Sequence, residues 1–410
     1  MKTFKNFLTE EKNTHMTHLE DAVIYGGVKG TREAINALRA MRDMLAGSAK
    51  SGRDVTVKWD GAPAVFAGID PRDGEFFVAK KGLFNKNPMV YKSHADVDAD
   101  ISNPDLANKM KVAYTELKKL GIKGIVQGDI MFTQDDLKTM SHDGKKYISF
   151  HPNTIVYAVE DGTDAAKEIK KAKIGVVWHT TYRGSDFESL SADYGVNVKA
   201  FKNVASVWSQ DAELQDMSGK ATLTASETME VNKHLTNAGK LFNKIASSTL
   251  KTLESDRSLA QTIETYNNTF VRAGTVIKDP KKHVDGLIKW IDARFEKEID
   301  KRKSEKGKQA QVDKRNQVMA FFSKENKRSL VFLFELQLAI VSAKLLIIAK
   351  LSKLNDINTF IKKANGYEVT GAEGFVAIDR LAGTALKLVD RMEFSTNNFS
   401  DETIKGWQRV

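Results

Sequence analysis

The 410-residue sequence contains no cysteine and only six prolines. A chain without cysteine has no disulfide framework, no thiolate nucleophile and no cysteine-ligated zinc or iron–sulfur site. The scarcity of proline argues against a proline-rich linker protein. The sequence also lacks an HExxH pair, a GxxxxGKS/T phosphate loop and a GxSxG nucleophile elbow. These absences exclude disulfide scaffolds and disfavour the metalloprotease, P-loop NTPase and serine hydrolase classes that use those motifs.

The composition is otherwise that of a globular protein with a basic excess. Apolar residues make up 41% of the chain and charged residues 28%, which are ordinary values for folded domains. Lysine and arginine number 63 against 53 acidic residues, giving a formal net charge of +10. Such an excess suits a polyanionic partner such as nucleic acid. The length predicts two or three domains.

One apolar stretch, residues 330–351, approaches the length of a membrane span. Glu335, Gln337 and Lys344 interrupt it. Each charge near a bilayer centre costs about 2.5–3.5 kcal/mol on insertion scales. We therefore expect a buried helix within a helical domain and no membrane partner.

The first ten residues, MKTFKNFLTE, have a basic start but lack the apolar region of a secretory signal. Phe4, Phe7 and Leu8 are spaced for one face of a short helix that could dock on the body. The segment also resembles the capsid-targeting peptides of internal head proteins of large tailed phages, with Leu8-Thr9-Glu10 as the cleavage site. That resemblance implies cleavage by a phage head protease, packaging in the virion and delivery to the host cytoplasm. Both interpretations stay open.

The pattern of apolar residues changes twice along the chain. Short apolar runs separated by Gly, Pro and Asp predict strands at 55–57, 64–69, 76–79, 125–132, 154–159 and 174–180. Helices are expected at 30–47 and 105–120, and helical periodicity dominates from 185 to 355 before strand-like runs return. This order predicts a sheet-containing domain interrupted by a helical insertion. The expected segments are 1–10, 11–184, 185–365 and 366–410.

A series of polar motifs follows these strands. Lys58-Trp59-Asp60-Gly61 comes directly after the strand at 55–57. A single KxDG motif is common by chance, but further motifs follow in order along the chain. They are FVAKKG at 77–82, IVQGDIMF at 125–132, IGVVWH at 174–179, EGFV at 373–376 and ALKLVDR at 385–391.

In this order the motifs resemble those of the covalent nucleotidyltransferase superfamily, the ATP-dependent DNA and RNA ligases and mRNA capping enzymes. The resemblance covers residues 54–182 and 366–399. It implies an α/β (α+β) adenylation domain of antiparallel sheets, with ATP and Mg²⁺ (or Mn²⁺) as cofactors. Only nineteen residues follow Arg391, too few for the OB-fold of DNA ligases and capping enzymes.

The resemblance also assigns roles to individual residues. Lys58 would be the nucleophile. The implied nucleotide-binding set is Asp60, Gly61, Lys81, Asp129, Trp178, Glu373 and Lys387. Within it Asp129 and Glu373 would bind the metal, Lys387 the α-phosphate, and Trp178 would stack on the base. Asp60 would serve the ribose or metal environment, and Lys81 would replace an arginine of the family.

These residue types fit the implied chemistry. A lysine must lose its proton before it can attack phosphorus, and nearby cations favour that loss. We expect Lys81 and Lys387 to supply those cations from facing strands. Attack on the α-phosphate of ATP would form a lysyl-AMP adduct on Lys58 and release pyrophosphate. The phosphate charge then requires cationic side chains and a divalent metal.

Two positions depart from the family pattern. Asp129 stands where the family usually has glutamate, and residue 385 is alanine where a second lysine often occurs. Both departures favour an alternative in which a head-packaged nucleic-acid-binding protein keeps a decayed, non-catalytic ligase fold. The retained Lys58, Asp60, Glu373 and Lys387 oppose it. Transfer of the nucleotide to a protein acceptor is a second alternative.

The helical region contains a basic stretch. Residues 295–328 hold eleven Lys or Arg and six acidic residues. Such a run is either a solvated helix face with ion pairs or a surface that contacts phosphates. The candidate nucleic-acid contacts are Lys301, Arg302, Lys303, Lys306 and Lys308. The sequence as a whole therefore predicts an ATP-dependent polynucleotide (DNA or RNA) ligase-like nucleotidyltransferase.

Overall fold

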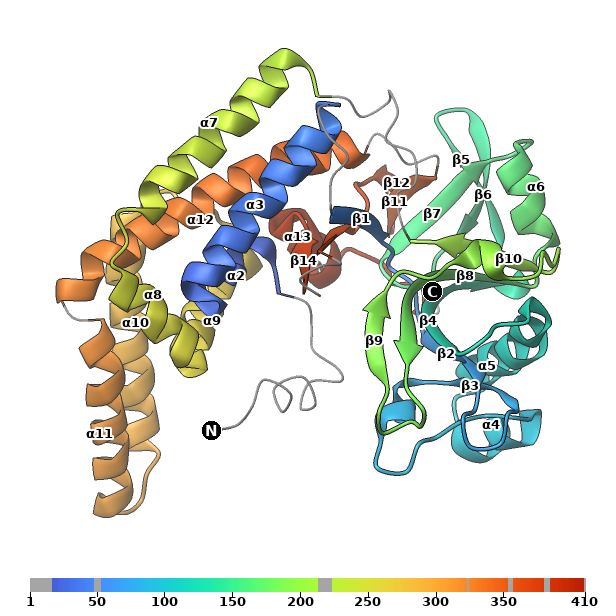
Figure 1. Ribbon diagram of the computed structural model, residues 1–410, viewed down its shortest axis with the longest axis horizontal. Helices are drawn as coiled ribbons and strands as arrows, with labels where there is room; N and C mark the ends of the chain where they lie inside the picture. The colour runs from blue at the N-terminus through green and yellow to red at the C-terminus, as the bar shows by residue number, and fades with distance from the viewer. Residues whose placement is uncertain are drawn as a thin grey trace.

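Figure 1 shows a helical lobe and a β-rich lobe, with a small sheet lying between them. The computed structural model describes residues 17–47, 53–212, 223–322, 324–352, 357–379 and 384–408. The architecture is mixed α+β with largely antiparallel sheets and a helical region, as the sequence predicts. The expected capsid-targeting peptide at 1–10 lies outside the described residues.

The described residues form three sheets. The six-stranded sheet has the order β10-β8-β4-β2-β3 with β9 beside β8, the five-stranded sheet β12-β11-β7-β6-β5, and the three-stranded sheet β1-β13-β14. All pairs are antiparallel except β10–β8. The strands are β1 (Arg53–Lys58), β2 (Ala64–Ile69), β3 (Phe76–Ala79), β4 (Ile125–Thr133), β5 (Lys138–His142), β6 (Lys145–Phe150), β7 (Ile155–Glu160), β8 (Ile174–Arg183), β9 (Ser191–Tyr194), β10 (Val207–Asp211), β11 (Asn358–Lys363), β12 (Gly366–Val369), β13 (Gly374–Asp379) and β14 (Thr384–Leu388).

The helices divide between the lobes. The β-rich lobe carries η2 (Lys81–Phe84), α4 (His94–Asp100), α5 (Pro104–Leu117), η3 (Lys118–Leu120), η4 (Gln134–Asp136), α6 (Asp164–Lys171) and η5 (Val198–Ala200). The helical lobe contains η1 (Leu19–Asp21), α2 (Ala22–Tyr25), α3 (Gly27–Leu45), α7 (Ala225–Phe242), α8 (Ser247–Ser255), α9 (Arg257–Arg272), α10 (Pro280–Asp300), α11 (Glu305–Phe321) and α12 (Lys324–Leu351). The last helix, α13 (Arg391–Phe399), packs on α9.

The expected boundaries of the helical insertion are wrong. Strands β9, β10 and β11 pair within the sheets, so the helices that interrupt the sheet order span 225–351 rather than 185–365. The N-terminal helices also belong to the helical lobe. Leu38 and Met41 of α3 share one core with Leu235 of α7 and Phe334 of α12. Their apolar faces are covered by other helices and by one face of the three-stranded sheet, whose Val57 and Phe375 belong to the same core.

Helix α12 lies at the centre of the helical lobe. Among the described residues, one helical segment, Asn326–Leu351, is long and apolar enough to cross a membrane. Leu333 and Ile340 are fully buried in the helical core. Lys344 is 1% exposed, and its Nζ donates to Glu20 Oε2 and to the carbonyl of Val389, both at 2.8 Å. The expectation of a helix buried in a helical domain is confirmed.

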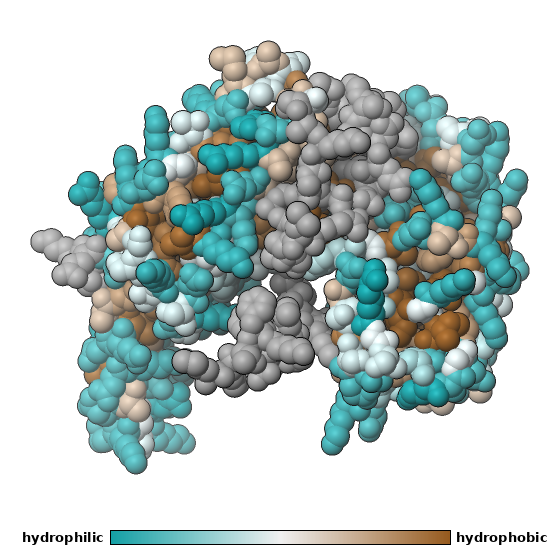
Figure 2. Space-filling view, in the orientation of Figure 1, coloured by the Kyte–Doolittle hydropathy of each residue, from teal (hydrophilic) through white to brown (hydrophobic). Residues whose placement is uncertain are grey.

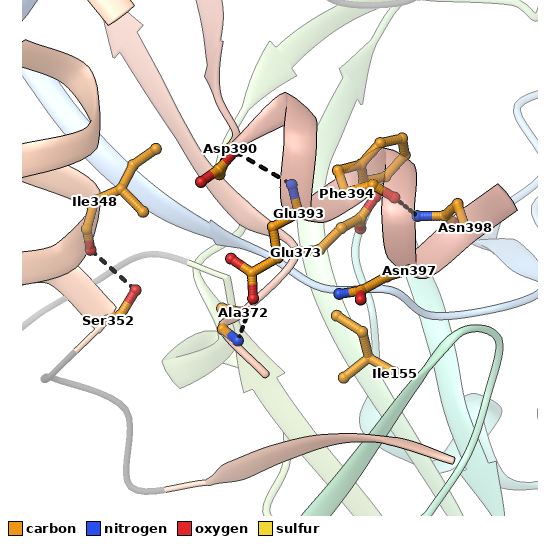
Figure 3. A pocket seen from close by; sticks show the side chains of 11 residues that line it. Ile155, Ile348, Ser352, Ala372, Glu373, Asp390, Glu393, Phe394, Asn397 and Asn398 are labelled. Atoms are coloured by element: carbon orange, nitrogen blue, oxygen red, sulfur yellow. Dashed lines mark hydrogen bonds between the residues drawn. The ribbon is translucent and has the colours of Figure 1, made fainter. Parts of the chain in front are cut away.

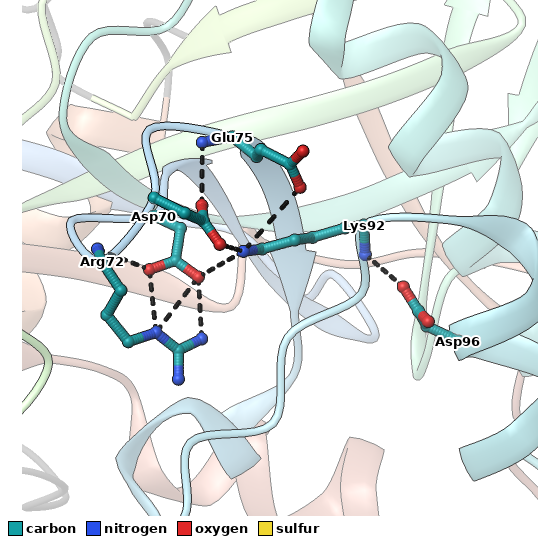
Figure 4. A network of polar contacts seen from close by, with 6 residues as sticks. Asp70, Arg72, Glu75, Lys92 and Asp96 are labelled. Atoms are coloured by element: carbon teal, nitrogen blue, oxygen red, sulfur yellow. Dashed lines mark hydrogen bonds and ion pairs between the residues drawn. The ribbon is translucent and has the colours of Figure 1, made fainter.

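A buried ion cluster fixes the β2–β3 turn and the segment that follows η2 (Figure 4). Asp70 accepts hydrogen bonds from Arg72 Nη2 at 2.7 Å, and Lys92 Nζ lies 2.8 Å from the same carboxylate. Burial alone would raise the pKa of Asp70, but the bonds from Arg72 and Lys92 hold it well below its usual range. The cluster therefore anchors both ends of the segment that carries Lys81.

We expect Asp70→Asn to lower the free energy of unfolding by about 1.5–3 kcal/mol, because it weakens charge-assisted bonds to a buried group. Urea unfolding at neutral pH measures the loss. Since the folded pKa of Asp70 is depressed, its contribution is present above pH about 4 and is lost as the pH falls further. The difference between wild type and variant should therefore shrink in acid. The exposed neighbour variant Asp73→Asn should change stability much less, and equal effects would contradict this account.

Candidate active site

The three-stranded sheet packs one of its faces on the helical core. Val57 and Phe375 point into the helical core, so the alternate residues of the same strands face the other way. Across the sheet Lys58 is opposite Gly374, and Val376 is opposite Lys387. This register places the side chains of Lys58 and Lys387 on the same face of the sheet, opposite the helical core.

Lys58 forms an ion pair with Glu373, the residue immediately before β13. The Glu373 side chain is 6% exposed, and its second oxygen, Oε2, is buried and has no hydrogen-bond partner among the described residues. Burial raises the pKa of Glu373 to about 7; Lys58 lowers it, while the negative charges of Asp60 and Asp129 raise it further. The candidate nucleophile is therefore held by a carboxylate that is poorly solvated.

Asp129 approaches this pair from β4 of the six-stranded sheet. Gly61 makes the approach possible, because a Cβ at that position would lie 2.5 Å from Asp129 Cβ. Burial raises the pKa of Asp129 to about 7, while Lys58 and Lys81 lower it and Asp60 raises it. About a quarter of the Asp129 side chain (23%) stays exposed. The structure thus brings Lys58, Asp129 and Glu373 together from separate strands.

His179 is a site residue that sequence reasoning missed. Gln127 pairs with Thr180 while Gly128 pairs with Trp178, so His179 is the extra residue of a β-bulge in β8. Bulges redirect side chains next to functional sites. The ring Nε2 lies 3.6 Å from Asp129 Oδ2, and burial, with a smaller effect of Lys58, lowers the pKa of His179 to about 4. The histidine is therefore neutral at neutral pH. In the sequence, the one signal for His179 is its place at the end of the apolar run 174–178.

The two expected cations occupy different environments. Lys387 is half-buried, and burial, together with Lys58 and Arg391, lowers its pKa. Lys81 is exposed in η2 but lies close enough to Asp129 to lower the pKa of that carboxyl. Both lysines therefore contribute positive potential near Lys58.

Asp60 forms a network of hydrogen bonds within the chain. Its carboxylate accepts hydrogen bonds from Asn153 Nδ2 at 2.8 Å and from the backbone N–H groups of Thr154 at 2.7 Å and Ile155 at 2.9 Å. Its own N–H donates to Tyr157 Oη at 2.7 Å. Asp60 is 7% exposed, so its bonding capacity is used in clamping the nucleophile loop to β7.

Trp178 does not have a free ring face for a base. It is fully buried in the core beneath the six-stranded sheet, and its Nε1–H donates to Ser209 Oγ at 2.7 Å. The alternation along β8 explains the correction, since Trp178 points to the face opposite Asp129. The expected stacking assignment is therefore wrong for this residue.

An aromatic wall occurs instead on the Asp129 side of the sheet. The ring of Tyr182 lies 5.4 Å from that of Phe84 and 5.7 Å from that of Phe66, measured between centroids. Tyr182 Oη donates to Gln127 Oε1 at 2.8 Å, and Gln127 is two residues from Asp129 along β4. Phe84 and Tyr182 are only partly buried. Such a wall suits a planar aromatic ligand.

Glu373 also lines a small pocket behind the site, between α12, α13 and β7 (Figure 3). Its volume of about 30 Å³ leaves room for a few water molecules at most. Asp390 in this pocket accepts bonds from the N-terminal N–H groups of α13, and Glu393 Oε1 accepts from the N–H of Gly371 at 2.8 Å. The pocket can hydrate the back of Glu373 but is too small for a nucleotide.

Asp129 and Glu373 fit a divalent cation. A cation would satisfy Glu373 Oε2, which lacks a hydrogen-bond partner among the described residues, and would offset the burial that raises the pKa of both carboxyls. The described part of the chain contains no group of three or more His, Cys, Asp or Glu side chains that could hold a metal. Magnesium that accompanies a nucleotide commonly uses one or two carboxylates together with phosphate oxygens and water. The pair therefore suits Mg²⁺ or Mn²⁺ that arrives with ATP.

The basic candidates lie apart from this site. Lys301, Arg302 and Lys303 connect α10 to α11, and the two helices form an arm that projects from the helical lobe (Figure 1). Hydrophilic residues cover the arm in Figure 2. Lys301 pairs with Glu298 at 2.7 Å and Lys308 with Glu305 at 2.9 Å. The arm therefore carries both ion-paired lysines and exposed lysines.

Comparison with known proteins gives one family. A protein-family model described as "Family of unknown function (DUF6267)" matches residues 13–403. No curated protein and no solved structure shows a significant match. Because the match spans nearly the whole chain, the protein belongs to this family of unknown function.

Proposed function

We propose that the protein is an ATP-dependent nucleotidyltransferase that acts through a lysyl-AMP adduct on Lys58, in the manner of polynucleotide ligases. One observation carries the proposal: Lys58, Asp129, Glu373 and Lys387, far apart in the sequence, meet at one side of a small sheet. A lysine beside two carboxylates and a second cation provides a nucleophile, oxygen ligands for a cation and a phosphate contact.

The reaction forms one bond and breaks one. The neutral amine of Lys58 attacks the α-phosphorus of ATP, an N–P bond forms, the bond from the α-phosphorus to the bridging oxygen breaks, and pyrophosphate leaves. The proton of the amine passes to solvent or to a nearby carboxylate. Lys387 contacts the α-phosphate, while Asp129 and Glu373 hold the cation. The divalent cation, when bound, offsets negative charge on the phosphate oxygens.

The aromatic wall supplies a place for the base. We expect Tyr182→Ala to raise the KM for ATP about 10-fold, because base stacking on an aromatic ring is worth about 1–3 kcal/mol. Labelling at saturating ATP should persist. Tyr182→Phe, which keeps the ring and removes only the bond to Gln127, serves as the control. An unchanged KM in a folded Tyr182→Ala protein would place the base elsewhere.

ATP labelled at the α-phosphate or at the γ-phosphate distinguishes adenylylation from phosphoryl transfer. With Mg²⁺ present, label from the α-phosphate should remain on the denatured chain and be lost in acid, whereas label from the γ-phosphate should leave as pyrophosphate. Retention of γ-label would indicate phosphoryl transfer and contradict the proposal. No label from any nucleotide, with nucleic-acid binding intact, would favour the non-catalytic alternative.

The arm formed by α10 and α11 is the proposed contact for the nucleic acid, DNA or RNA. Helix α11 buries only Phe321, so its polar surface is not required by a core. Among described residues, no ion pair involves Lys303 or Lys306, and both are exposed. Lysines in such a position can contact phosphates and release counterions. This support is independent of the chemistry at Lys58.

Changing Lys301, Lys303, Lys306 and Lys308 to Gln should weaken nucleic-acid binding and flatten its salt dependence by about 0.9 in log–log slope for each lost phosphate contact on duplex DNA. A salt titration of binding by fluorescence anisotropy measures both effects. The matched control is Lys281→Gln with Lys282→Gln, at the other end of α10. Covalent labelling by ATP should survive in all these variants. Equal binding by wild type and arm variant would identify the arm as a solvated helix face.

A further inference from the structure

Asn153 forms hydrogen bonds with two separate segments of the chain, the loop after β1 and the C-terminal residues 406–407. On one side its Nδ2 donates to Asp60 Oδ1 at 2.8 Å. On the other, its Oδ1 accepts from Trp407 Nε1 at 3.3 Å, and its backbone carbonyl accepts from the N–H of Gly406 at 2.6 Å. The side-chain amide is therefore oriented by Trp407 while it donates to the carboxylate that follows the candidate nucleophile by two residues.

Residues 403–407, here called the strap, pack tightly against the loop that precedes β7 and contains Asn153. A Cβ at Gly406 would lie 1.9 Å from the carbonyl oxygen of His151, so only glycine permits the approach. Lys405 Nζ donates to Thr154 Oγ1 at 3.1 Å and to the carbonyl of Asn397 at 2.9 Å. The strap thus joins the loop before β7 to α13.

The inner side of the same loop holds Asp60. The N–H groups of Thr154 and Ile155 donate to its carboxylate, and Trp59 packs between the core of the helical lobe and that of the β-rich lobe. Lys58 ends β1 directly before these residues. A displacement of the loop before β7 would therefore be transmitted to Lys58 through the Asp60 bonds.

We propose that the strap is a positioning element for Lys58, acting through Asn153 and Asp60. The inference rests on the proposed function, because positioning matters for a nucleophile. A misplacement of about 1 Å can cost a reaction about 100-fold in rate. The strap does not contact the nucleotide, so its loss should slow the transfer step without weakening ATP binding.

Two variants of the full-length protein test the proposal. Asn153→Asp keeps the shape of the side chain but replaces the donor to Asp60 by a carboxylate, and Gly406→Ala forces the strap away from His151. Asn237→Asp on the exposed surface of α7 makes the same charge change away from the site. The measurements are the single-turnover rate of covalent labelling, the KM for ATP, the melting midpoint, and the acetylation rate of Lys58 by acetic anhydride, read by mass spectrometry.

We expect the two variants to label about 10–100-fold more slowly at saturating ATP and at a temperature where all variants are folded, with the KM close to that of wild type and of Asn237→Asp. The melting midpoint should fall in both variants, because one places two carboxylates in contact and the other forces a backbone clash. The acetylation rate of Lys58, and not that of other lysines, should change at least about 3-fold, because its local environment shifts. Labelling rates within about 2-fold of wild type in folded variants would overturn the proposal, as would a loss that merely follows the unfolded fraction. If wild type takes no label, the proposed function fails, and an unchanged acetylation rate would separately overturn the positioning role.

Discussion

Replacing Lys58 by methionine should abolish covalent labelling by ATP, a loss of at least about 10³-fold. Methionine has a similar length but no amine, so no N–P bond can form at this position. The fold should survive, because the Lys58 side chain is 25% exposed and Glu373, with a pKa raised to about 7, can become neutral when its partner is removed. Gel electrophoresis under denaturing conditions after incubation with α-labelled ATP measures the loss.

The control for this experiment is Lys86→Met, an exposed lysine in the segment that follows η2. It should label at the wild-type rate. Label retained by a folded Lys58→Met protein would show that another nucleophile, with Lys387 the nearest candidate on the same face, carries the nucleotide. That result would overturn the assignment of Lys58.

The second large effect is expected in the helical lobe. Lys344→Met should lower the free energy of unfolding by about 3 kcal/mol, because it removes the closer cationic partner of the buried Glu20 carboxylate and leaves only the longer contact to Arg391 Nη1 at 3.6 Å. Burial alone would raise the pKa of Glu20, but Lys344 and Arg391 hold it below its usual range. Arg391 also contacts Asp21 at 2.8 Å, and both cations lie beside the end of β14. The cluster therefore joins the helical lobe to the strand that carries Lys387.

A double variant separates the cost of the unpaired charge from the cost of lost packing. Glu20→Gln combined with Lys344→Met should recover much of the stability lost by Lys344→Met alone, as buried pairs replaced together often cost little. Urea unfolding at neutral pH provides the comparison, and Lys233→Met on α7, 72% exposed, should have little effect. A double variant as unstable as the single one would contradict this electrostatic explanation.

Much of the strand pattern could be predicted from the sequence. The runs expected at 55–57, 64–69 and 125–132 lie within β1, β2 and β4, because alternating or continuous apolar residues mark buried strands. Strands β5, β6 and β12 went unrecognised. They carry exposed or charged residues at many positions, and only pairing with neighbouring strands explains their conformation.

The candidate site was predicted less completely. Lys58, Asp129 and Glu373 converge as expected from the motif order. Trp178 was misassigned because a motif specifies residue types and not which face of a strand they occupy. The hydrogen bonds that Asp60 accepts from the loop before β7 could not be predicted from the motif either. His179 depends on a bulge, a feature of pairing register that local sequence does not reveal. The positions of Asn153 and the strap depend on contacts between segments more than 200 residues apart.

The central claim is that Lys58 carries the nucleotide. The most direct test is mass spectrometry of the wild-type protein after incubation with ATP and Mg²⁺, first intact and then digested under conditions that preserve the N–P bond. The account predicts a gain of one AMP moiety on the intact chain, located on Lys58 in the peptide that contains residues 55–61. No gain in mass under these conditions, or an AMP moiety located on any other residue, would contradict it.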